Sequence, residues 1–208
     1  MKKVVLSAAV CAMAFSANAE GADTASASVF SGIYGGLGVG GSFLKSTMDG
    51  METMKANRVM GSFVIGGGKV FKNNTYLSGE VLIDFMKNRK KSYESRAKGA
   101  NLQMKGFIPQ VDVKLGYAAR SDVLGYGKFG CALSKVSFYD GLNDRSKHKT
   151  SFVLGLGAEK AFRCKFSTAI EADYNFGFKS DDKGIGLENI KANKGWSVRA
   201  LAKYNIKH

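Results

Sequence analysis

The chain has little proline, little cysteine and comparatively little negative charge. Its 208 residues include one proline and three cysteines, and 31 lysines and arginines exceed 17 aspartates and glutamates. So few cysteines exclude a disulfide framework. The longest uncharged apolar run, residues 4–15, is shorter than the roughly 20 residues that a membrane-spanning helix needs. A helical membrane protein is therefore excluded.

The uncharged run near the N-terminus is typical of a secretory signal peptide. Lys2 and Lys3 precede it, and residues 17–19 supply the small-x-small pattern of a cleavage site. We therefore expect residues 1–19 to be removed and the mature chain to begin at Glu20. Cleavage would leave a net charge of +12, from 29 basic and 17 acidic residues.

The rest of the chain predicts one all-β domain. Residues 20–29 are small and polar, and we expect a flexible lead-in there, followed by a single domain over residues 30–208. The 26 glycines and the short segments rich in aromatic residues favour strands, because so much glycine would destabilise helices.

Long polar stretches and short turns alternate along this domain. We expect long loops at residues 45–57, 87–101, 139–150 and 179–194, and short turns near residues 73–74, 120–121 and 163–164. Long connections at one rim and short ones at the other are typical of a closed barrel. The pattern predicts an eight-stranded antiparallel up-and-down transmembrane β-barrel.

Side chains alternate between two faces along the eight predicted strands, since neighbouring strand residues point to opposite sides. In the clearest segment Phe166, Ile170, Ala172, Tyr174, Phe176 and Phe178 share one face, and Ser167, Ala169, Glu171, Asp173 and Asn175 share the other. A soluble barrel would enclose the aromatic face. We instead place the aromatic face in lipid, because the other face is rich in glycine, as a narrow lumen requires, and because aromatics suit interfacial girdles.

Two segments resemble a known family. Residues 152–178 carry Gly155, Gly157, Glu159, Glu171 and Tyr174 in the pattern of a family hairpin, and residues 32–43 resemble its glycine-rich first strand. The family is the small outer-membrane β-barrel proteins of Gram-negative bacteria, the porin-like surface-antigen group related to the OmpA-type transmembrane barrel. The resemblance implies location in the outer membrane, insertion by the barrel-assembly machinery, contact with outer-membrane lipid, no cofactor and no enzymatic activity.

The predicted lumen face carries ten charged residues of both signs. They are Glu80, Asp84, Asp112, Lys114, Lys128, Glu159, Glu171, Asp173, Arg199 and Lys203. The interior of an eight-stranded barrel is just filled by side chains, so we expect these charges to pair as a packed ionic plug. A narrow or gated ion path is the alternative.

The second predicted loop is strongly basic. It contains Lys87, Arg89, Lys90, Lys91, Arg96 and Lys98 against Glu94 alone. Such a cluster attracts the phosphates of lipopolysaccharide or anionic glycans of a host surface. A solvated loop without a specific ligand is the alternative, and an exported protein does not meet nucleic acid as a physiological partner.

The other motifs in the sequence do not favour a nucleotide, catalytic or metal site. Gly36, Gly38 and Gly41 spell the dinucleotide-binding pattern, but no helix is predicted after them. His148 lies near Ser146 without a fixed orienting carboxylate, and no pair of residues has metal-ligand spacing. Cys131 and Cys164 are expected to be free thiols.

The sequence therefore predicts a non-enzymatic surface protein that contributes to envelope integrity and makes external contacts through long, partly basic loops. A small porin that passes ions or small solutes is the alternative function.

Overall fold

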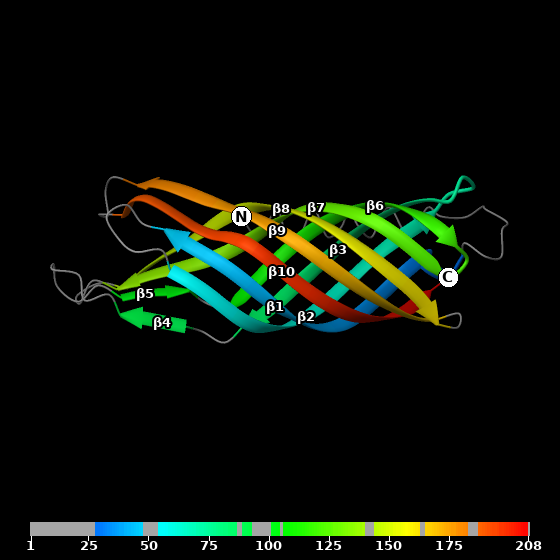
Figure 1. The fold of residues 1–208 in the computed structure, drawn as a ribbon, viewed down its shortest axis with the longest axis horizontal. Helices are drawn as coiled ribbons and strands as arrows, with labels where there is room; N and C mark the ends of the chain where they lie inside the picture. Colours follow the sequence, from blue (N-terminus) through cyan, green and yellow to red (C-terminus); the bar gives the residue numbers. More distant parts are fainter. Residues whose placement is uncertain are drawn as a thin grey trace.

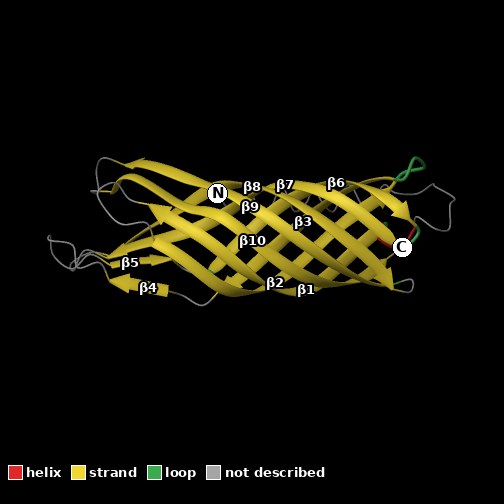
Figure 2. Cartoon of the chain, in the orientation of Figure 1, coloured by secondary structure: helices red, strands yellow, loops and turns green. Residues whose placement is uncertain are grey.

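Eight long antiparallel strands form an elongated barrel in which the strands are steeply tilted (Figure 1). The structure is a computed structural model and describes residues 28–47, 54–86, 89–92, 101–104, 106–139, 144–162, 165–182 and 187–207. The barrel strands are β1 (Gly32–Thr47), β2 (Met54–Val70), β3 (Thr75–Met86), β6 (Phe107–Arg120), β7 (Val123–Tyr139), β8 (Asp144–Phe162), β9 (Phe166–Asp182) and β10 (Leu187–Lys207). Almost all of the described chain is strand (Figure 2).

The strands close into a ring in chain order. Each barrel strand pairs antiparallel with the next, β7 pairs with β8, and β1 pairs with β10, which confirms the predicted eight-stranded barrel. Two short strands, β4 (Arg89–Ser92) and β5 (Asn101–Met104), pair with each other, and β5 also pairs with β7. In the part of the chain that the structure describes, no helix has the length and apolar character to cross a membrane.

The pairing register places apolar side chains on the outer wall. Leu156 and Ile170 are 72% and 66% exposed, whereas Glu171, which follows Ile170 in β9, is fully buried. The same alternation runs through β3, β6 and β7. An outer wall this apolar is expected only where lipid rather than water surrounds it.

The predicted long loops are too long, because strands continue through much of them. β7 runs to Tyr139 and β8 starts at Asp144, so most of the loop expected at residues 139–150 is strand. Similarly, β10 begins at Leu187 inside the loop expected at residues 179–194, and β4 lies inside the one expected at residues 87–101. Beyond the membrane both faces of a strand meet water, so hydrophobic alternation ends while backbone pairing continues.

Two of the three predicted short turns lie in the described residues at the opposite rim and are compact, whereas residues 163–164 of the third lie outside the described part. Between β2 and β3, the amide of Phe71 donates to the carbonyl of Thr75 at 2.8 Å, and the side chain of Asn73 accepts from the Thr75 amide. Asn74 has a φ of 62°, a left-handed conformation that asparagine tolerates better than most residues. Short turns face the periplasm in barrels of this kind, which orients the molecule. We call the two ends the turn rim and the outer rim.

The N-terminal turn η1 (Ser28–Phe30) closes the lumen at the turn rim. Phe30 is 3% exposed and packs in an apolar cluster with Val70, Tyr76, Ala118, Leu124, Tyr126 and Ala161. The side chain of Asn205 donates to the carbonyl of Val29 at 2.6 Å. Ser28 and Val29, the end of the expected lead-in, therefore belong to this turn, and residues 1–27 lie outside the described part.

Glycines in β1 leave room inside the lumen for the backbone and side chains of the neighbouring strand β10. A Cβ on Gly38 would lie 2.7 Å from the carbonyl oxygen of Ala200 and against the side chain of Leu201. Gly36 is similarly confined by the backbone of Ala202. These glycines therefore keep a narrow lumen packed, and the next element in the described chain is strand β2 instead of the helix that a dinucleotide site would require.

Candidate functional site

The lumen is lined by charged side chains that alternate with the lipid-facing residues. All ten residues assigned to the lumen from the sequence lie inside the barrel and are buried: Glu80, Asp84, Asp112, Lys114, Lys128, Glu159, Glu171, Asp173, Arg199 and Lys203. They come from β3, β6, β7, β8, β9 and β10, so the site draws on most of the ring. An ion pair between non-neighbouring strands therefore crosses the lumen.

Glu171 is the centre of the network. Its Oε1 accepts from Lys114 Nζ at 2.6 Å and from the hydroxyl of Tyr126 at 2.7 Å, and its Oε2 accepts from Lys128 Nζ at 2.7 Å. Lys114 Nζ also lies 2.6 Å from Glu80 Oε2. Lys114 thus links β3 on one side of the barrel to β9 on the other, which fills the middle of the lumen.

A second set of pairs extends toward the outer rim. Lys128 Nζ lies 3.2 Å from Asp112 and 3.1 Å from Asp173. Arg199 donates to Asp173 at 2.8 Å and lies 3.3 Å from Asp84. Each cation therefore bridges at least two carboxylates, and the pairs form one continuous chain of charge with the Glu171 centre.

Neutral donors complete the coordination of two of these carboxylates. The hydroxyl of Ser62 donates to Asp84 at 2.6 Å. The side-chain amide of Gln110 donates to both oxygens of Asp112 at 2.8 and 2.7 Å. Buried carboxylates are costly unless their lone pairs are satisfied, so these donors reduce the desolvation cost.

A third set lies toward the turn rim. Lys203 Nζ pairs with Glu159 at 2.6 Å, and the Ser167 hydroxyl donates to the same carboxylate at 2.6 Å. The ammonium group of Lys203 also lies 4.8 Å from the ring centroid of Tyr34, whose hydroxyl donates to Glu80 at 3.0 Å. Tyr34 therefore joins this set to the central one.

The sequence analysis missed several lumen residues, among them three tyrosines and an arginine. Tyr34, Tyr76 and Tyr126 point inward, although aromatics were expected mainly on the lipid face, and Arg58 is 9% exposed. The sequence did indicate the inward position of Tyr34, because Tyr34 and Gly36 are two residues apart and therefore point to the same face of the strand. Each tyrosine has an apolar ring that fills space and a hydroxyl group, and those of Tyr34 and Tyr126 bond to carboxylates in the lumen.

The described residues give no catalytic or metal-binding arrangement for the histidine, metal-ligand and cysteine candidates. His148 pairs in register with Lys135, on a strand rather than in the expected loop, and the side chains of Ser146 and His148 lie outside the described residues. No group of three potential metal ligands occurs in the described residues. Cys131 is a free thiol on the outer wall, and Cys164 lies outside the described part.

The basic segment at residues 87–98 is only partly described. Arg89, Lys90 and Lys91 lie on β4, where they pair in register with β5, and nothing is described of their side chains. Lys87, Arg96 and Lys98 lie outside the described residues.

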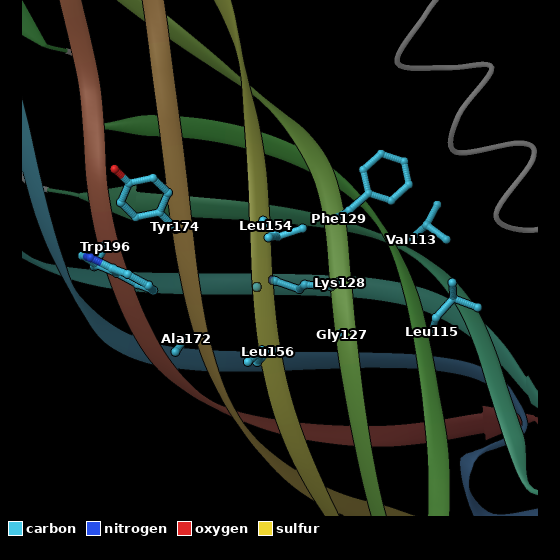
Figure 3. Close-up of a pocket in the computed structure, with 11 residues that line it drawn as sticks. Val113, Leu115, Gly127, Lys128, Phe129, Leu154, Leu156, Ala172, Tyr174 and Trp196 are labelled. Atoms are coloured by element: carbon cyan, nitrogen blue, oxygen red, sulfur yellow. The ribbon is translucent and has the colours of Figure 1, made fainter.

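The outer wall has a shallow apolar groove of about 430 Å³. It crosses β6 to β10, and its lining includes Phe129, Leu154, Tyr174 and Trp196 (Figure 3). The ring centroids of Tyr174 and Trp196 lie 4.8 Å apart on neighbouring strands. The groove belongs to the lipid-facing surface. The two rings lie in the half of that surface nearer the outer rim, where an aromatic girdle is expected.

A family model decides what kind of barrel this is. The model described as outer membrane protein beta-barrel domain matches residues 5–203. The chain belongs to this family. It is therefore an outer-membrane β-barrel protein of the Gram-negative type, as the resemblance implied.

Solved structures with the same architecture are distant in sequence. Neisserial surface protein A is 13% identical, with a TM-score of 0.54 over 85% of this chain and 98% of that chain. The attachment invasion locus protein Ail of Yersinia pestis is 16% identical, with a TM-score of 0.48 over 83% and 99%; Ail has also been solved with the heparin analogue sucrose octasulfate. The N-terminal barrel of Pseudomonas aeruginosa OprF is 13% identical, with a TM-score of 0.41 over 84% and 97%. No curated protein matches the chain.

Proposed function

We propose that this chain is a non-enzymatic surface protein whose lumen is a packed ionic plug and whose function lies in envelope integrity and external contacts. The observation that carries the proposal is the position of Glu171. Its carboxylate holds two ammonium groups and a phenol from β6 and β7 at 2.6–2.7 Å, in the centre of the barrel. Charges paired this closely occupy the volume that an ion path would need.

Apolar layers support the same proposal. The cluster around Phe30 lies at the turn rim, and a second cluster of Ile108, Ala132 and Val153 lies toward the outer rim. A hydrated ion would therefore have to pass the apolar cluster at the turn rim and the ion pairs, and it would meet apolar side chains of β6, β7 and β8 toward the outer rim. Hydrophobic constrictions oppose ion passage because they exclude water.

Lysines at the outer rim favour anionic external contacts. Lys45 pairs in register with Lys55 on β2 and with Lys194 on β10, so three adjacent strands carry lysine at the same level. Lys45 and Lys194 are exposed, and they lie two residues beyond Phe43 and Trp196 toward the outer rim. Like charges side by side repel each other, and a bound phosphate or sulfate relieves that repulsion. With the basic segment at residues 87–98, this row makes lipopolysaccharide phosphates and anionic host glycans the expected partners.

Single-channel recording in planar bilayers tests the plug. We expect the refolded protein to give no lasting conductance steps above those of the bare bilayer. A Lys114→Ala/Glu171→Ala variant removes the central pair and serves as the positive control, with conductance expected to appear. Heat-modifiable migration on gels verifies that both proteins are folded barrels. Steady conductance steps from the unaltered protein would overturn the plug and favour the small porin.

A further inference from the structure

The turn rim carries its own belt of positive charge, which the outer-rim contacts do not explain. Five basic residues whose side chains are described lie there: Lys69, Lys72, Arg120, Lys160 and Lys165. Asp122 is the carboxylate that the described residues place among them at the surface, since Glu159 is buried and paired with Lys203. We call the five cations, together with Phe71 and Phe162, the basal collar.

The cations of the basal collar differ from those of the lumen in having no ionic partner among the described residues. Each of the four lumen cations Lys114, Lys128, Arg199 and Lys203 is held by at least one carboxylate within 3.3 Å. Among the described residues, no carboxylate pairs with any cation of the collar. The collar therefore leaves its positive charge available to a partner outside the protein.

Two lysines of the collar share one local geometry. Lys69 Nζ lies 5.8 Å from the ring centroid of Phe71, and Lys160 Nζ lies 5.7 Å from that of Phe162. In both cases the lysine is two residues deeper in the barrel than the phenylalanine, about 7 Å along the strand. The aliphatic stem thus follows the outer wall and carries the charge back toward the rim, as lysines do at a membrane surface.

The two lysine–phenylalanine pairs lie on opposite sides of the barrel. Lys69 is on β2 and Lys160 is on β8, and three strands separate β2 from β8 in either direction around the ring. Phe71 and Phe162 are 41% and 48% exposed on the outer wall. Exposed aromatics at this level mark the boundary between the apolar core and the headgroups.

We propose that the basal collar binds the anionic headgroups of phospholipids in the periplasmic leaflet. The ammonium groups of Lys69 and Lys160 lie over phenylalanine rings on the outer wall of the barrel. A lipid headgroup beside that wall can therefore reach them more directly than a soluble polyanion below the turn rim. Each lysine near a membrane surface adds about a fivefold attraction for anionic lipid before salt screening. The proposal depends on membrane insertion, which the family establishes, and it goes beyond the proposed function of the outer rim.

The single tryptophan allows the two rims to be probed separately. Trp196 lies on the outer wall in the half of β10 nearer the outer rim. A Trp196→Phe/Phe162→Trp variant moves the reporter into the collar and retains an aromatic ring beside Lys160. Both proteins are refolded into phosphatidylcholine vesicles that contain phosphatidylglycerol, and quenching by brominated phosphatidylglycerol is compared with quenching by brominated phosphatidylcholine.

We expect brominated phosphatidylglycerol to quench the reporter at position 162 more strongly than brominated phosphatidylcholine. Adding Lys69→Gln and Lys160→Gln should remove at least roughly half of that preference, whereas Lys69→Arg and Lys160→Arg should retain it, since each glutamine removes one charge. The matched outer-rim pair Lys45→Gln/Lys194→Gln should leave the signal at position 162 unchanged.

Either of two results would overturn the proposal that the basal collar binds anionic lipid. The first is equal quenching by the two brominated lipids at position 162. The second is an unchanged preference in the glutamine variant, which would mean that the lysines are merely solvated. Heat-modifiable migration of every variant establishes that the comparison is made between folded barrels, and the arginine variants supply folded, charged references. Neither result depends on the lumen's conductance, so failure of the collar is distinguishable from failure of the plug.

Discussion

Glu171 is stable in the barrel interior only because several donors reach it at once. A buried carboxylate loses several kcal/mol of hydration, and a single partner rarely compensates for that loss. Here Lys114, Lys128 and Tyr126 all bond to it. Both lysines are themselves buried, so they depend on the carboxylate as much as it depends on them.

We predict that Glu171→Gln lowers the free energy of unfolding by about 3–5 kcal/mol, because it leaves buried ammonium groups short of one negative charge. Glu159→Gln is the matched control. Glu159 pairs with one lysine and is 7% exposed near the turn rim, where water can replace the lost interaction, so its loss should be smaller. Urea unfolding in lipid vesicles, followed by tryptophan fluorescence, measures both. Equal losses would contradict the central role of Glu171.

A second prediction at this scale concerns the two faces of β9. Ile170 is 66% exposed to lipid, and Ile170→Arg should cost about 2–4 kcal/mol because an arginine at mid-membrane is poorly solvated. Asn175→Arg should cost about 1 kcal/mol, chiefly the hydrogen bond that the Asn175 side chain accepts from the Gly177 amide. The yield of heat-modifiable barrel on refolding and the urea midpoint compare the two variants. Similar defects in both would mean that the faces of β9 are assigned wrongly.

At the scale of elements, the strands could be predicted from the sequence but their ends at the outer rim could not. Inside the membrane one face meets lipid and the other meets the lumen, so Ile170 and Glu171 alternate in chemical character. Beyond the membrane that contrast disappears, and the polar residues from 187 to 194 form strand without any periodic signal.

For the candidate site, the face on which each charged residue lies could be predicted, but the pairs that these residues form could not. Strand parity alone placed the ten charged residues in the lumen, but which of them meet depends on how the sheet curls. Glu80 and Glu171 share Lys114 although they lie far apart in the sequence. The inward position of Tyr34 was missed, although it has the strand parity of Gly36, and its bond to Glu80 depends on the register between strands.

The N-terminal turn η1 acts as a lid on the turn end of the lumen. We predict that Phe30→Ala lowers the free energy of unfolding by about 3–5 kcal/mol, since Phe30 is 3% exposed and its removal leaves a cavity in the apolar cluster. Phe30→Leu is the matched control and should cost less than about 1.5 kcal/mol, because it keeps most of the volume. Urea unfolding in vesicles compares them. Indistinguishable stabilities would show that the turn packs too loosely to act as a lid.

At the scale of the whole molecule, the excess positive charge lies outside the lumen. The described lumen contains six carboxylates and five cations when Arg58 is counted, so it is close to neutral. The chain as a whole has a formal net charge of +14. The excess therefore lies outside the lumen, where it acts on the surroundings of the barrel and does not attract ions into it.

The last prediction tests whether the outer rim is the external contact surface. Replacing Lys87, Arg89, Lys90 and Lys91 with glutamine should weaken binding to lipopolysaccharide and to heparin by at least roughly tenfold at low salt, because several surface charges act together. Raising the salt from 0.15 to 1 M shortens the screening length from about 8 to about 3 Å, so the unaltered protein should lose affinity steeply.

Two paired variants locate the effect within the molecule. Lys45→Gln/Lys194→Gln should also weaken binding, because this pair belongs to the lysine row at the outer rim. Lys69→Gln/Lys160→Gln removes the same charge from the turn rim and should leave binding to external lipopolysaccharide or heparin unchanged. Surface plasmon resonance on protein oriented in supported bilayers measures all three variants. Equal losses at the two rims would mean that net charge alone attracts the polyanion, and an unchanged affinity in the quadruple variant would leave the segment at residues 87–98 as a solvated surface.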